Sequence, residues 1–145
     1  MGLSLADFEG RWRLSRRIDD ARAGLTGRLE GEALFVAGQG GLVLTETGRL
    51  RYGDGPPLQA ERRYLWREEA GGIAVFFEDG RPFHWFSSDA PETHHDCPPD
   101  LYHVRYDFSA WPEWSAVWQV SGPRKDYVME SHYTRVTGCG GVPER

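Results

Sequence analysis

A Gly-x-Trp motif near the start of the chain and one arginine near its end constrain the fold most strongly. Gly10 and Trp12 open the first run of alternating apolar and polar residues, and Arg135 lies in the last such run. An arginine in a last strand can cover an indole in a first strand only where the two strands are neighbours. Small antiparallel barrels bring these strands together, and they either fill their interior or keep a pocket for one ligand. The pair therefore predicts a closed up-and-down β-barrel.

Runs with a two-residue period follow one another along the chain, separated by turn-forming Gly, Pro and Asp. We predict an all-β fold, a single antiparallel up-and-down β-barrel of about 8–10 strands, preceded by a short helical turn at residues 4–8. Residues 88–100 are rich in Pro, His and Asp and show little periodicity, so they are predicted to form a loop. The predicted strands begin at Gly10 and cover residues 24–36, 42–52, 58–69, 73–78, 81–87, 101–108, 113–120 and 125–136.

Length and charge narrow the class of protein. The 145 residues predict one barrel domain over residues 1–138 and a loose tail over residues 139–145. A formal net charge of −5 argues against nucleic acid as a partner, and no apolar run is long enough for a membrane helix. Residues 1–7 lack the pattern of a secretion signal, and two cysteines, Cys97 and Cys139, are too few for a disulfide framework. We therefore expect a bacterial cytoplasmic protein with free thiols.

Two resemblances add to this interpretation. Residues 8–12 (Phe-Glu-Gly-Arg-Trp) and 133–136 (Tyr-Thr-Arg-Val) resemble the two ends of the calycin barrels, the lipocalins and fatty-acid-binding proteins. The chain is similar, nearly end to end, to a bacterial domain family of unknown function. The segments that carry this second resemblance are residues 63–66, 79–84, 95–102 and 122–127, the last of which reads Gly-Pro-Arg-Lys-Asp-Tyr. The calycin resemblance implies a small apolar or amphipathic ligand inside the barrel. No cofactor is predicted, and heme stays an alternative because the nitrobindins, which share this architecture, hold heme iron through a histidine.

Arginines that share a strand face with apolar residues are candidate ligand contacts. An arginine inside a barrel must be paired with an acid or must meet an anionic ligand. A network of Arg with Glu and Tyr would be structural, whereas an unpaired inward arginine would indicate a carboxylate ligand. The arginines concerned are Arg16, Arg62 and Arg105, and their candidate internal partners are Glu46 and Glu130. Strand parity alone leaves both interpretations open.

A second candidate is the segment of residues 122–127, where Gly-Pro ends one strand and two cations open the next. Arg124 and Lys125, the only lysine, could hold a carboxylate or phosphate at a barrel mouth, with Tyr127 adding a hydroxyl. Adjacent strand residues point to opposite faces, so only one of the two cations can face inward. Anion binding and a structural hairpin both remain open.

We predict that the protein binds a small amphipathic or anionic ligand inside a β-barrel, in a site with apolar walls and few polar groups. The predicted walls are Trp66, Phe76, Trp85, Tyr106, Trp114 and Trp118. The predicted ligand-binding residues are Arg62, Tyr64, Trp66, His84, His103, Arg105, Trp118, Arg124, Lys125 and Tyr127.

An enzyme is the second class of function that the sequence allows. The sequence lacks a nucleophile elbow, a phosphate loop and a dinucleotide fingerprint, but His84 or His103 beside a carboxylate could support acid–base catalysis. His95 and Cys97 are the candidate metal ligands, although their spacing fits no standard zinc pattern and no metal is predicted.

A filled barrel that acts through its surface is the third class. It would expose an aromatic patch around Phe108, Trp111 and Trp114, which could form a homodimer or bind a partner.

Overall fold

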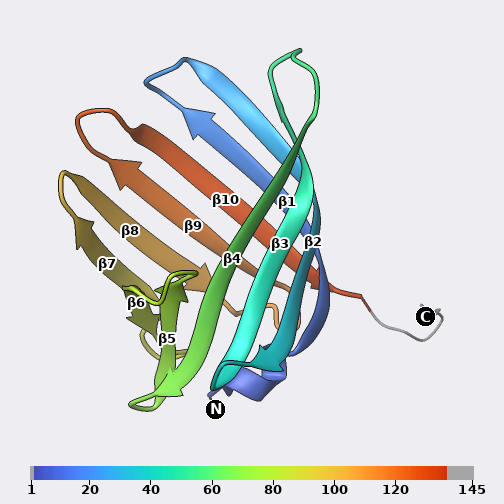
Figure 1. The fold of residues 1–145 in the computed structure, drawn as a ribbon, viewed down its shortest axis with the longest axis vertical. Coiled ribbons are helices and arrows are strands. Elements are labelled where there is room, and N and C mark those ends of the chain that lie inside the picture. The colour runs from blue at the N-terminus through green and yellow to red at the C-terminus, as the bar shows by residue number, and fades with distance from the viewer. Residues whose placement is uncertain (1, 137–145) are drawn as a thin grey trace.

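The computed structural model describes residues 2–136, which form a barrel of ten antiparallel strands preceded by one short 3-10 helix (Figure 1). The elements are η1 (Leu5–Phe8), β1 (Gly10–Asp20), β2 (Leu25–Gly38), β3 (Gly41–Tyr52), β4 (Leu58–Glu69), β5 (Gly72–Phe77), β6 (Pro82–Phe86), β7 (Glu92–Cys97), β8 (Asp100–Asp107), β9 (Trp114–Ser121) and β10 (Asp126–Arg135). The all-β barrel prediction is confirmed, and so is the helical turn, whose N-cap is Ser4. The predicted tail at residues 139–145 lies outside the described residues.

The strands follow one another as a meander whose first and last members pair, and the resulting barrel is nearly closed. The order in the sheet is β6-β5-β4-β3-β2-β1-β10-β9-β8-β7, so β1 pairs with both β2 and β10. In this register Trp12 lies opposite Arg135, and the guanidinium Cζ of Arg135 is 3.9 Å from the centre of the indole. The predicted cation–π contact that joins the two ends of the chain is therefore confirmed. Strands β6 and β7 are the two edges of the sheet, and the short segment 87–91 links them.

One strand falls where a loop was predicted, so that prediction is wrong. β7 (Glu92–Cys97) pairs with β8 along its whole length, from Glu92 opposite Arg105 to Cys97 opposite Asp100. Its residues alternate between exposed and half-buried, but the half-buried members include Thr93 and His95. Because the inward side chains are polar, the strand has no apolar period to detect, and the backbone ladder with β8 determines its conformation.

The interior divides into a filled end and a polar middle. At the end covered by η1, the closed end, Phe8, Trp12, Phe35 and Trp114 are almost completely buried and their rings contact one another. The opposite end, the mouth, is formed by the β1–β2, β3–β4, β7–β8 and β9–β10 turns (Figure 1). The backbones of the paired strands β2 and β3 approach each other closely at Gly31, where a Cβ would collide with the carbonyl oxygen of Thr47. Glycine at this position lets the sheet curve into a barrel.

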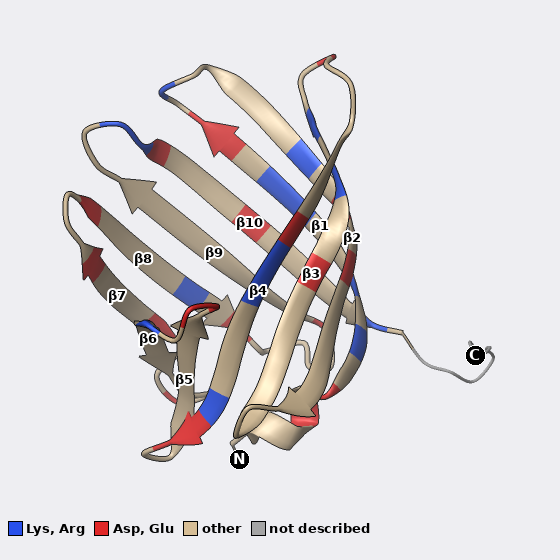
Figure 2. Ribbon diagram, viewed as in Figure 1, with Lys and Arg blue, Asp and Glu red and all other residues tan. Residues whose placement is uncertain are grey.

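Charged residues of both signs are scattered over the strands and turns seen in Figure 2, instead of gathering into one basic face. Within residues 2–136, the structure contains no helix of the length and apolar character needed to cross a bilayer.

Candidate functional site

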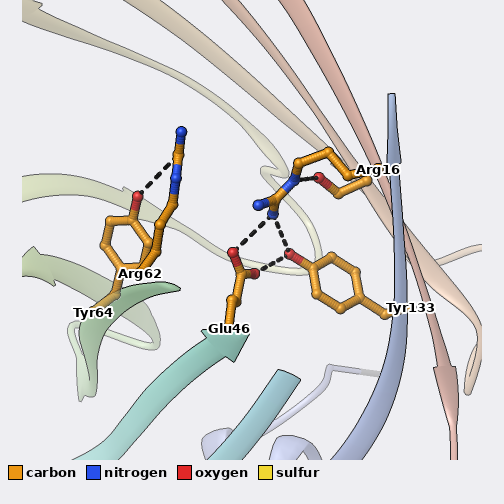
Figure 3. A network of polar contacts seen from close by, with 6 residues as sticks. Arg16, Glu46, Arg62, Tyr64 and Tyr133 are labelled. Atoms are coloured by element: carbon orange, nitrogen blue, oxygen red, sulfur yellow. Dashed lines mark hydrogen bonds and ion pairs between the residues drawn. The ribbon is translucent and has the colours of Figure 1, made fainter. Parts of the chain in front are cut away.

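A buried polar network lies at the middle of the barrel and accounts for one of the inward arginines. Arg16 and Glu46 are each 4 % exposed, and the Nη2 atom of Arg16 lies 2.8 Å from Oε1 of Glu46. Arg16 Nε donates to Ser131 Oγ at 2.7 Å, and the Tyr133 hydroxyl donates to the other carboxylate oxygen (Figure 3). Burial raises the pKa of Tyr133 well above its ordinary value, so this hydroxyl keeps its proton. The network is satisfied within itself and is structural.

Glu46 is therefore the internal partner that was expected, but the same expectation for Glu130 is wrong. Glu130 lies on the outer, exposed face of β10. The sequence could not tell which of Glu46 and Glu130 points inward, because each alternates in phase with apolar residues of its own strand.

Arg62 is the inward arginine that has no acid. It lies opposite Glu46 in the β3–β4 ladder, yet the carboxylate of Glu46 turns to Arg16 and Tyr133 instead (Figure 3). Among residues 2–136, no carboxylate lies within 4 Å of the Arg62 guanidinium, and its one side-chain hydrogen bond goes from Nη1 to the hydroxyl of Tyr64 at 3.4 Å. Its Cζ also lies 5.8 Å from the ring centre of Trp118. The half-buried guanidinium of Arg62 thus contacts aromatic side chains, and several of its N–H groups have no hydrogen-bond acceptor among the described residues.

The surroundings of Arg62 form an open hollow of about 490 Å³ at the junction of β4, β5 and the β5–β6 turn. Two other arginines line this hollow, but Arg63 pairs with Glu61 at 3.2 Å and Arg81 with Asp79 at 2.8 Å. Arg62 is the cation of this hollow that an incoming anion can reach without displacing an acid. The hollow is lined by Arg62, Arg63, Tyr64, Phe77, Glu78, Asp79 and Arg81.

The deeper interior is almost full. Between the aromatic rings there remains a void of about 20 Å³, roughly enough for one water molecule. Trp66, Tyr106, Trp114 and Trp118 of the predicted apolar walls line this void. The interior therefore holds no large central cavity among the described residues, and the hollow at Arg62 is the candidate site that contains predicted binding residues.

Other predicted site residues lie apart from this hollow. His103 and Arg105 are on the outer face of β8, where His103 contacts Glu92, so their expected inward orientation is wrong. Val104 and Tyr106 are the buried, inward residues of β8, so the residues that alternate with them, His103 and Arg105, point outward. Phe76 and Trp85 are also on the outer side, since Arg67 covers the ring of Phe76 and Trp85 is 37 % exposed. A bulge between Val75 and Phe76 shifts the β5–β6 register, which no periodicity indicated.

The mouth segment places its two cations differently. Arg124 is exposed on the β9–β10 turn, whereas Lys125 reaches Asp100 at 3.1 Å and the hydroxyl of Tyr102 at 3.4 Å. Tyr127 is half-buried on the inner side of β10. Lys125 already has an acid that sequence reasoning missed, and its polar contacts are to residues of the neighbouring strand β8.

The residues of the alternative functions lie apart from the hollow at Arg62. His103 does lie beside a carboxylate, that of Glu92, but on the outer face of β8. His84 is buried and bonds to the Tyr106 hydroxyl at 2.9 Å instead of to a carboxylate. Trp114 is buried, and Trp111 packs against Phe8 with ring centres 5.1 Å apart, so the expected exposed aromatic patch is instead part of the closed end. His95 lies against Phe83, and no cluster of three metal-binding side chains occurs in the described part of the chain.

The pKa of His84 gives a testable pH dependence. Burial, with a smaller contribution from His95, lowers this pKa from 6.5 to about 3. Below pH 6.5 the unfolded chain therefore binds a proton at this residue that the folded chain does not, and stability falls as pH falls. Between pH 6.5 and 5 we expect a loss of about 2 kcal/mol from this residue. Urea denaturation at both pH values should show a smaller pH dependence for His84→Phe than for the wild type and for the exposed control His94→Gln. Equal slopes in all three proteins would contradict the prediction.

Comparisons with known proteins agree with this geometry. Residues 8–135 match the model of a family described as "Family of unknown function (DUF6314)". The chain belongs to this family. The predicted resemblance to a family of unknown function is confirmed by this match. The predicted calycin-like barrel is supported at the level of the fold by the solved structure of an S-type phycobiliprotein lyase from Guillardia theta. That structure has a TM-score of 0.62 and 7 % identity, over 92 % of this chain and 91 % of the other. The comparison with curated proteins found no match.

Proposed function

We propose that this protein binds a small amphipathic carboxylate, with its anionic group on Arg62. The single observation that carries the proposal is the unpaired guanidinium of Arg62 at the edge of the barrel interior. The Arg62 guanidinium has no carboxylate within 4 Å among the described residues and keeps unused N–H donors, and a bound carboxylate can accept two parallel N–H···O bonds from them. The neighbouring arginines keep their own acids, so the site selects one anion at one position.

The rest of the site suits an apolar or aromatic ligand body. Tyr64 and Phe77 line the hollow beside Arg62, and several side chains on the same inner face are only partly buried. Those side chains are Leu50, Ala60, Tyr64, Phe77, Tyr102 and Trp118. A concave site with aromatic walls and one oriented charge is typical of small-molecule binding. The phycobiliprotein lyase that shares the fold belongs by its name to a class of enzymes, but at 7 % identity it supports the barrel alone.

The test is thermal unfolding with three probes of matched length: decanoate, decanol and decyltrimethylammonium. Decanoate should stabilise the wild type, by about 2.7 kcal/mol when its concentration is 100 times the dissociation constant, and the other two should not. Arg62→Met should abolish the effect, whereas the matched control Arg124→Met, at an exposed rim arginine, should retain it. Without ligand, Arg62→Met should be no less stable than the wild type, because no ion pair is lost. A decanoate shift that persists in Arg62→Met would overturn the proposal.

A further inference from the structure

Two buried polar atoms have no hydrogen-bond partner among the described residues. They are Nδ1 of His84 and Nε1 of Trp114. Leaving such an atom unsatisfied in the interior costs about 1–3 kcal/mol, so each one indicates a missing partner. Both residues line the same void of about 20 Å³. A void of this size accepts one oxygen-sized group and no more.

The void adjoins the proposed anion site. Tyr64 lines the hollow at Arg62 on one side and the void on the other. Trp118, which also lines the void, lies below the Arg62 guanidinium. Tyr64 is therefore the shared wall along which a ligand bound at Arg62 must extend to reach the void.

The side chains around the void restrict which group can occupy it. The indole N–H of Trp114 only donates, so the group must offer an acceptor oxygen. His84 is buried among aromatic rings and bonds through Nε2 to Tyr106, so its Nδ1 faces a partner as a neutral group. Glu46 also lines the void, and its charge disfavours a second carboxylate there. The fitting group is a neutral hydroxyl or carbonyl oxygen.

We propose that the ligand is an oxygenated carboxylic acid, whose neutral hydroxyl or carbonyl oxygen enters the void and accepts a hydrogen bond from Trp114 while its carboxylate binds Arg62. This inference rests on the proposed function and makes the ligand class narrower. The void has room for one water molecule in the free protein, and the ligand oxygen would take over the hydrogen bonds of such a water. A plain alkyl acid leaves that position to water.

The test compares decanoate with a series of hydroxydecanoates that carry the hydroxyl at carbons 2 to 6, by calorimetric titration of the wild type. At least one member should bind about 3- to 10-fold more tightly than decanoate, the gain expected from one net hydrogen bond. Trp114→Phe removes the donor and keeps most of the ring, so the gain, measured as the ratio of hydroxydecanoate to decanoate affinity within the same protein, should vanish. Trp85→Phe, at an exposed tryptophan on the outer side, is the matched control and should keep the gain.

The outcomes separate this inference from the proposed function. If decanoate binds in an Arg62-dependent way but no hydroxydecanoate binds more tightly, the oxygenated class is wrong and the anion site stands. If the gain survives in Trp114→Phe, the void is not where the oxygen binds, and the inference is also wrong. If neither decanoate nor any hydroxydecanoate binds, the proposed function fails first. The wild-type series needs no variant, so an unstable Trp114→Phe protein would still leave the inference open to refutation.

Discussion

Replacing Glu46 with leucine is expected to lower the free energy of unfolding by about 3–5 kcal/mol, as found when one partner of a buried ion pair is removed. Arg16 would then keep Ser131 and Tyr133 as neutral partners, but its charge would have no acid in the barrel interior. The Tyr133 hydroxyl would lose its acceptor as well. Urea denaturation of the wild type and the variant at pH 7 measures the effect.

The double variant Arg16→Met with Glu46→Leu separates the ion pair from simple packing. Replacing both charges by apolar groups removes the uncompensated cation, so most of the lost stability should return. Glu61→Gln is the matched control, because its pair with Arg63 is half-exposed on the outer side and should contribute little. If Glu46→Leu were no more destabilising than Glu61→Gln, the network would not hold the barrel together as described.

The sequence was sufficient for the architecture because the architecture rests on local rules. Alternation and turn residues are each visible over a few residues, and they agree with the pairing of Trp12 and Arg135 that the two end motifs predict. β7 was missed because its inward residues include Thr93 and His95, so the ladder with β8 gave it a strand conformation without an apolar period.

The site could be predicted only in part, since it depends on which face of each strand is inside. Arg62, Tyr64 and Trp118 were identified and do lie together. His103 and Arg105 were placed inside by a phase that the burial of neighbouring residues reverses. Partner choice was equally hidden: Glu46 could pair with Arg16 or with Arg62, and only the three-dimensional positions of Tyr133 and Ser131 decide between them. That choice leaves Arg62 unpaired.

Replacing Trp12 with alanine is the second change expected to have a large effect, a loss of about 3–5 kcal/mol. The indole is fully buried, and its Nε1 donates to the carbonyl oxygen of Phe8 at 2.9 Å. Its ring lies between the guanidinium of Arg135 and the rings of Trp111 and Trp114. The substitution would therefore leave a cavity and also loosen the helix that covers the closed end.

Arg135 links the same indole to the start of the chain, which explains why the effect should spread beyond one cavity. Its guanidinium donates to the carbonyl oxygens of Glu9, at 2.9 Å, and Asp7, at 2.6 Å, so β10 holds η1 over the barrel end. Arg135→Met should remove these bonds and the cation–π contact but leave the indole in place, and so cost less than Trp12→Ala. Trp85→Ala, at a half-exposed tryptophan, should cost about 1 kcal/mol or less. Urea denaturation that ranks Trp12→Ala first, then Arg135→Met, then Trp85→Ala would show that closure of the barrel depends on the buried indole. Equal losses for the two tryptophans would contradict it.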